Sequence, residues 1–210
     1  YSTECLYHHG EVDRRARPSY TIEDFEALFA EIDSLPGGSF VGCVQVCCAA
    51  DAIEETLKLV DWGRKHLGGR IFATFGIHPS SFEQYTPEME MRIDSCLQAC
   101  GPQAVAVGEC GLDYNKRDRE MRDDREFCNR MQDAFAKQAA LAKRHGLPLV
   151  VHSRDAVTDT LEVLRKMLPP EHPVYLHCFM GQPEEMMEFL DAWPNGYIGL
   201  TGAVTWPAAT

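Results

Sequence analysis

The sequence contains no long apolar run. Nowhere do its 210 residues include the roughly 18 consecutive apolar residues that a transmembrane helix requires. The first residues also have no apolar core of the kind found in a secretory signal peptide. We therefore expect no membrane partner and a location in the cytoplasm, with the nucleus as the alternative.

Positive charge is scarce. The chain has 20 Lys and Arg against 32 Asp and Glu, which gives a net charge of −12. Such a protein repels a phosphate backbone unless basic patches or bound cations intervene, which argues against a general nucleic-acid coat protein. An enzyme whose metal ions meet the phosphate is not excluded. Two basic clusters would contact flanking phosphates, or alternatively be solvated surface charges: Arg14, Arg15 and Arg17, and Lys116, Arg117 and Arg119.

Three widespread catalytic motifs are also absent. The sequence has no G-x-S-x-G elbow, no P-loop and no G-x-G-x-x-G motif. These absences argue against a serine hydrolase, a P-loop NTPase and a dinucleotide-binding enzyme, and we expect no organic cofactor. The nine cysteines do not follow zinc-finger spacing, and several lie in apolar runs. We predict free thiols in a reducing compartment.

Short apolar runs rich in β-forming residues alternate with stretches of helical periodicity. The predicted strands are Phe40–Cys48, Arg70–Ile77, Ala104–Cys110, Leu147–His152, Pro173–Phe179 and Gly196–Val204. The predicted helices are Thr21–Asp33, Asp51–Leu67, Pro87–Cys100, Glu120–His145, Asp155–Leu168 and Gln182–Trp193. One of them carries Gln138 within an otherwise apolar stripe. The alternation predicts an α/β fold with a parallel sheet, doubly wound or barrel-shaped, in a single domain over residues 1–210.

Four successive predicted strands end in a histidine or a glutamate. His78 directly follows the second apolar run, and Glu109, His152 and His177 lie at or near the ends of the third, fourth and fifth runs. In parallel α/β folds the carboxyl ends of the strands form the active-site face. Imidazole and carboxylate groups together suit a divalent cation such as Zn, Mn or Mg, which polarises a phosphoryl or carbonyl oxygen. Taken singly, each histidine has a simpler interpretation as a loop or core residue, but four in succession favour a metal centre.

The segment "AVAVGECGLDYN" places the glutamate in an unusual setting. Glu109 ends a buried strand, where a carboxylate needs a cation or hydrogen-bond donors. We expect Gly108 and Gly111 to let the backbone turn tightly at this point. Asp113 would then order the loop that follows.

Five motifs together resemble the TatD family of metal-dependent deoxyribonucleases: "FGIHP", "VAVGECGLDYN", "LPLVVHSRDA", "LHCFMG" and "YIGLTGAVT". "GECGLDY" is similar especially to the eukaryotic branch of that family. The resemblance runs from about Phe40 to Val204. It implies a TIM (β/α)8 barrel of the amidohydrolase type.

The resemblance also implies residue functions. Glu109 would be a metal-bridging carboxylate, with His152 and His177 as further metal ligands, in a site for one or two divalent ions (Mg, Mn or Zn). His78 and Arg154 would act in catalysis beside Glu109 and contact the scissile phosphate. They would help to neutralise the charge that develops on the phosphate.

Asp113 and Tyr114 are implied as substrate-binding residues, because they would shape the loop after the strand of Glu109. The implied activity is hydrolysis of DNA phosphodiester bonds by metal-activated water. The enzyme would act as a 3'-5' exonuclease, an endonuclease or both. We expect a monomer with DNA as its substrate.

Two elements of the family pattern lie outside the sequence. The first barrel strand, with H-x-H or G-x-N, and the last, with ETD-x-P, are not in the chain. We therefore expect a barrel without its first and last strands, and a metal site that lacks one carboxylate. Two alternatives remain: another metal-dependent hydrolase of the amidohydrolase type, or a truncated, non-catalytic family member that acts as a binding protein.

Overall fold

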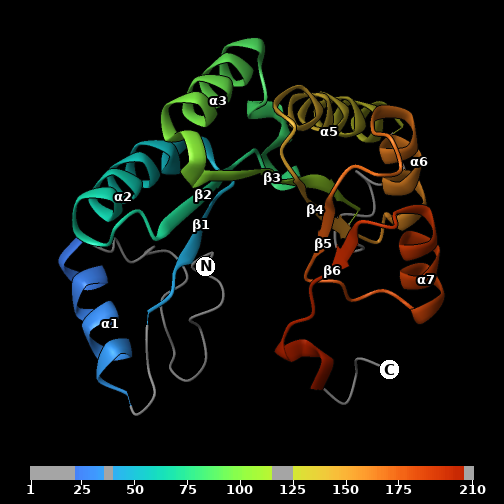
Figure 1. Ribbon diagram of the computed structural model, residues 1–210. Helices are drawn as coiled ribbons and strands as arrows, with labels where there is room; N and C mark the ends of the chain where they lie inside the picture. Colours follow the sequence, from blue (N-terminus) through green and yellow to red (C-terminus); the bar gives the residue numbers. More distant parts are fainter. Residues whose placement is uncertain (1–21, 36–39, 115–124, 206–210) are drawn as a thin grey trace, which may run out of the picture.

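The computed structural model describes residues 22–35, 40–114 and 125–205. They contain one sheet of six parallel strands, in the order β1-β2-β3-β4-β5-β6 (Figure 1). The strands are β1 (Cys43–Cys47), β2 (Ile71–Phe75), β3 (Ala104–Asp113), β4 (Leu149–Arg154), β5 (Val174–His177) and β6 (Gly196–Ile198). The predicted parallel α/β fold is confirmed.

Helices lie on the outer side of the curved sheet (Figure 1). They are α1 (Ile22–Ser34), α2 (Ile53–His66), α3 (Pro87–Cys100), α5 (Arg125–His145), α6 (Val157–Met167) and α7 (Pro183–Ala192). Short 3-10 helices are η1 (Ala50–Ala52), η2 (Pro79–Gln84), η3 (Gly101–Gln103) and η5 (Gly202–Thr205). None of the described helices has both the length and the apolar composition needed to cross a bilayer.

The boundary of α3 follows from capping chemistry. The hydroxyl of Thr86 accepts a hydrogen bond from the backbone N–H of Met89 at 3.2 Å, and Pro87 occupies the first helical turn. Such a cap satisfies one of the backbone donors that every helix leaves unpaired at its start. The predicted order of cap and proline is therefore confirmed.

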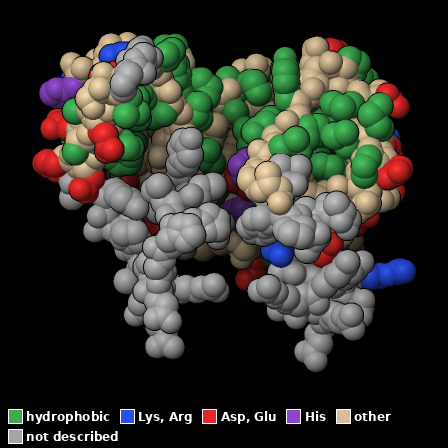
Figure 2. All heavy atoms as spheres, turned by 90° about the horizontal axis from the view of Figure 1, so that it is seen from below, with side chains coloured by type: hydrophobic (Ala, Val, Ile, Leu, Met, Phe, Trp, Pro, Cys, Tyr) green, Lys and Arg blue, Asp and Glu red, His purple; other side chains and the backbone are tan. Residues whose placement is uncertain are grey.

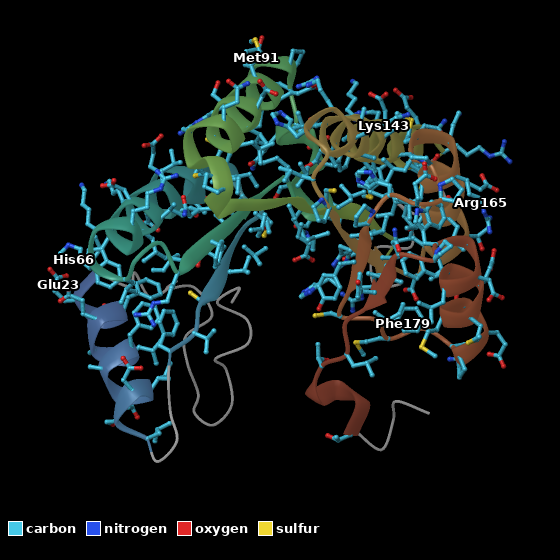
Figure 3. The ribbon with its side chains drawn as sticks, in the orientation of Figure 1. Glu23, His66, Met91, Lys143, Arg165 and Phe179 are labelled. Atoms are coloured by element: carbon cyan, nitrogen blue, oxygen red, sulfur yellow. The ribbon has the colours of Figure 1, made fainter. Side chains whose placement is uncertain are left out.

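The strands alternate between two environments, because successive side chains of a strand point to opposite faces. In β5, Val174 and Leu176 are almost completely buried. Tyr175 and His177 lie on the other face and remain partly exposed. Figure 3 shows Lys143, on α5, on the outer side of the molecule. The apolar core thus lies between sheet and helices, and the other face of the sheet is available for polar groups.

Strand β3 continues beyond the point at which we expected a turn. It runs through Gly108 and Gly111 to Asp113, so the predicted turn is wrong. Both glycines have positive φ, and a Cβ on Gly111 would lie 2.0 Å from the carbonyl oxygen of His152. The glycines therefore allow close contact with β4 across a register shift between Val107 and Cys110. They do not end the strand.

The last strand is shorter than predicted. Strand β6 ends at Ile198, and η5 occupies part of the range expected to be extended.

The two basic clusters predicted to contact phosphate lie outside the described residues, as does the expected start of the helix at Glu120. Cys47, Cys96, Cys100 and Cys110 are buried as thiols, in agreement with the predicted free cysteines.

Candidate metal centre

Glu109 lies within β3 and is only 5% exposed. Its Oε1 is 3.0 Å from Nδ1 of His152 and 3.6 Å from Nε2 of His78, and its Oε2 is 3.7 Å from Nε2 of His177. Burial alone raises the pKa of Glu109, but the hydrogen bond from His152 and the three imidazoles outweigh it and lower that pKa below its ordinary value. The structure thus keeps a buried, ionised carboxylate among three histidines.

His152, near the end of β4, lies between two carboxylates. Its Nδ1 faces Glu109, and its Nε2 is 3.1 Å from Oδ2 of Asp113. Burial by itself lowers the pKa of His152, but the hydrogen bonds to Asp113 and Glu109 and the charges of both carboxylates raise it to about 9. Asp113 therefore fixes the orientation of the ring and directs Nδ1 toward Glu109.

His78 follows β2 and completes a group of potential ligands. Its Nε2 is 3.2 Å from Nδ1 of His152. His78, Glu109 and His152 each offer one ligand atom, and these three atoms lie within 4.8 Å of one another. The three residues could therefore hold a metal ion. On its other side, Nδ1 of His78 accepts a hydrogen bond from the backbone N–H of Ser80 at 3.1 Å.

His177 ends β5 beside this group. Its Nε2 faces Oε2 of Glu109 and is also 2.8 Å from Sγ of Cys178. Register pairing of His152 with His177 places the two rings on adjacent strands. The four predicted residues are therefore brought together, with Glu109 in the middle.

Of the remaining predicted residues, Asp113 contacts His152, whereas within the described part of the chain Arg154 and Tyr114 form no hydrogen bond or ion pair with these four. Arg154 ends β4 with an exposed side chain, and it pairs in register with Asp113. Tyr114 is buried, and its hydroxyl lies 3.0 Å from Oδ2 of Asp159 and 2.9 Å from Nε2 of Gln132. Its hydroxyl thus bonds to side chains of α5 and α6, which the sequence did not single out.

Figure 2 shows histidine side chains near the middle of the face seen from below, between hydrophobic regions on either side. The side chain of His177 lies on the face of β5 opposite the buried Val174 and Leu176, so the site lies on the face of the sheet turned away from the apolar core.

Comparison with protein families identifies a match over most of the chain. Residues 21–210 match the family model "TatD related DNase". A human protein named 3'-5' RNA nuclease TATDN2 is 28% identical over 190 residues, which cover 90% of this chain and 24% of that protein. A 3'-5' ssDNA/RNA exonuclease TatD from Enterobacter lignolyticus is 34% identical over 154 residues, which cover 73% of this chain and 54% of that protein.

Solved structures have the same fold. The structure of YJJV, a TatD homologue from Escherichia coli K12, has a TM-score of 0.72 and 25% identity, covering 90% of this chain and 66% of that one. A TatD-family hydrolase from Entamoeba histolytica has a TM-score of 0.71 at 20% identity, covering 87% of this chain and 58% of that one. The chain spans about half the length of the bacterial relative described above and about a quarter of the human one. The six-stranded sheet matches the TIM-barrel fold of the TatD structures.

Proposed function

Because the chain belongs to the TatD-related DNase family, we propose that it forms the metal-binding part of a nuclease that hydrolyses phosphodiester bonds. The observation that carries this proposal is the buried carboxylate of Glu109, which faces three imidazoles at 3.0, 3.6 and 3.7 Å. A buried carboxylate with neighbouring imidazoles is a donor set that suits divalent cations. Residues 1–210 would act as a single domain.

Glu109, His152 and His177 would hold the divalent ion, with His177 in place of the His78 of the three-residue group described above. Asp113 accepts the hydrogen on Nε2 of His152, so loss of the Nδ1 proton leaves a lone pair directed toward Glu109. Bound Mg, Mn or Zn, as one ion or two, would supply Lewis acidity to a phosphate oxygen and activate water. Binding would require the ionised carboxylate of Glu109 and the imidazoles in their neutral form, so His152 would release a proton when the ion binds.

His78 fits a different function in the same site. Because its Nδ1 accepts the N–H of Ser80, the neutral ring carries its hydrogen on Nε2, which points toward Glu109 and His152. His78 would therefore donate a hydrogen bond to a phosphate oxygen rather than bind the ion. Arg154, at the exposed end of β4, would add positive charge beside the same phosphate.

The substrate would be single-stranded nucleic acid. The bacterial relative is named for 3'-5' exonuclease action on ssDNA and RNA, and the human one for 3'-5' action on RNA. We propose that the substrate here is DNA and that it is cleaved from the 3' end. RNA should be tested as a second substrate. Asp113 and Tyr114 would shape the site next to the substrate. A monomer in the cytoplasm or nucleus remains a prediction.

The deciding experiment measures nucleotide release from 3'-labelled single-stranded DNA with added Mg, Mn or Zn. We expect release that EDTA abolishes, and we expect Glu109→Gln to lower the rate at least ~100-fold, since loss of a group that holds the metal removes most of the catalysis. Glu188→Gln is the matched control, because this carboxylate lies on the exposed face of α7.

Other outcomes separate the alternatives. Hydrolysis of small esters or amides without action on DNA or RNA would favour another metal-dependent hydrolase. Absence of both divalent-ion binding and nuclease activity would favour a binding protein. Equal rates for wild type and Glu109→Gln would contradict the proposed site.

A further inference from the structure

A buried glutamine on α5 contacts the backbone immediately before His78. Gln138 is only 1% exposed and lies on the inner face of the helix among apolar side chains. Its Oε1 accepts a hydrogen bond from the N–H of Ile77 at 2.8 Å, and its Nε2 donates to the carbonyl oxygen of Ile77 at 3.2 Å. One side chain thus satisfies both backbone groups of a residue 61 positions away.

The strand pattern explains why Ile77 needs this partner. The pairing of β2 with β3 ends at Phe75 and Val107. Beyond it, Gly76 and His78 donate to the carbonyl oxygens of Cys47 and Cys48, each at 2.9 Å.

Alternate residues of a strand direct their backbone groups to opposite neighbours, so those of Ile77 point the other way. Ile77 is itself 1% exposed, and a buried backbone group without a partner is costly. The amide of Gln138 therefore takes the place of a neighbouring strand.

We infer that Gln138 is a positioning residue for His78, and this inference rests on the proposed function of the site. Its two hydrogen bonds hold the chain at Ile77, while the bond from His78 N–H to Cys48 holds the next residue from the other side. Together they fix the backbone from which the imidazole reaches toward Glu109. A displacement of about 1 Å at a catalytic group is enough to lower a rate ~100-fold.

The test replaces Gln138 by Met, which has a similar length and volume but makes neither hydrogen bond. The imidazole signals of His78, assigned with His78→Ala, are recorded by NMR in the metal-free chain. In the Gln138→Met variant we expect these signals to shift or broaden, while those of His145 stay unchanged. Gln138→Asn, whose amide is one methylene shorter, is expected to act in the same direction and serves if the Met variant does not fold.

Leu141→Ala is the control, because Leu141 is fully buried on the same helix. It should lower the thermal midpoint without moving the signals of His78. Unchanged His78 signals in both Gln138 variants, or equal changes in the Leu141 control, would overturn the inference.

A double-mutant cycle gives a second readout. Gln138→Met should lower kcat/KM about 10- to 100-fold in the wild-type background and less than about 3-fold in the His78→Ala background. Equal losses in both backgrounds would show that Gln138 does not act through His78. If wild type has no nuclease activity, the proposed function fails, and the NMR result still decides the positioning inference.

Discussion

At the scale of single residues, the arrangement around His152 determines what the site can bind. The ring lies between Glu109 and Asp113. Its Nδ1 is within hydrogen-bond distance of Glu109, and its Nε2 is within hydrogen-bond distance of Asp113. A carboxylate behind a histidine fixes which ring nitrogen is free for a metal. The sequence predicts that Asp113 orders the loop after β3, and in the structure its carboxylate contacts His152 directly.

Asp113→Asn is predicted to lower the stability of the metal-free protein in a pH-dependent way. The pKa of His152 is raised to about 9 in the folded protein. A raised histidine pKa stabilises the fold fully below the unfolded value of about 6.5, and this contribution disappears as the pH rises through about 9. The variant should therefore lose roughly 1–2 kcal/mol near pH 6 and much less near pH 10.

Urea unfolding of EDTA-treated protein at both pH values measures this difference. Asp133→Asn, an exposed carboxylate on α5 that pairs with Lys137, is the control. A loss of the same size at both pH values would show that Asp113 does not act through the charge of His152.

At the scale of elements, β3 is the strand that makes the site possible. It carries Glu109 in its interior and Asp113 at its end. Its close approach to β4 brings both carboxylates to the imidazole of His152. This approach depends on Gly111, where the backbone has φ of 143° and no room for a side chain.

Gly111→Ala is predicted to destabilise the protein by about 3 kcal/mol or more, because a Cβ would clash with the backbone and the conformation disfavours it. Gly146→Ala is the matched control. Gly146 also has positive φ, of 62°, but no atom lies within 4 Å of a Cβ built there. That variant should cost only about 1–2 kcal/mol. Denaturant unfolding compares the two, and similar losses would contradict the close approach of β3 and β4.

At the scale of the whole molecule, the proposed ligands lie on three adjacent strands. Glu109 belongs to β3, His152 to β4 and His177 to β5. A cation held by all three would link segments that are far apart along the chain. Metal binding should therefore stabilise the folded protein as a whole, because the unfolded chain does not assemble these donors.

A divalent ion at about 100 times its Kd is predicted to add about 2.7 kcal/mol to the free energy of unfolding. For a chain of this length, that corresponds to a rise of about 5–10 °C in Tm. Differential scanning calorimetry with Zn or Mn, reversed by EDTA, measures the shift. Glu109→Gln should lose it and Glu188→Gln should keep it. An equal shift in both variants would indicate binding to surface carboxylates instead.

Much of the fold could be read from the sequence, because helices and strands leave local patterns. The Thr86–Pro87 start of α3 is an example, since a cap depends only on neighbouring residues. The continuation of β3 through Gly108 and Gly111 could not be read in this way. A glycine permits both a tight turn and a close strand contact, and only the position of β4 distinguishes them.

The sequence by itself determined that this is a parallel α/β protein whose successive strands carry histidines and a glutamate at or near their carboxyl ends, because periodicity and residue type are local properties. Only the tertiary structure decided which atoms meet. It directs Asp113 to Nε2 of His152, the hydroxyl of Tyr114 to Asp159, and the amide of Gln138 to Ile77. These contacts join residues 39 to 61 positions apart, so they exist only once the sheet and helices have packed.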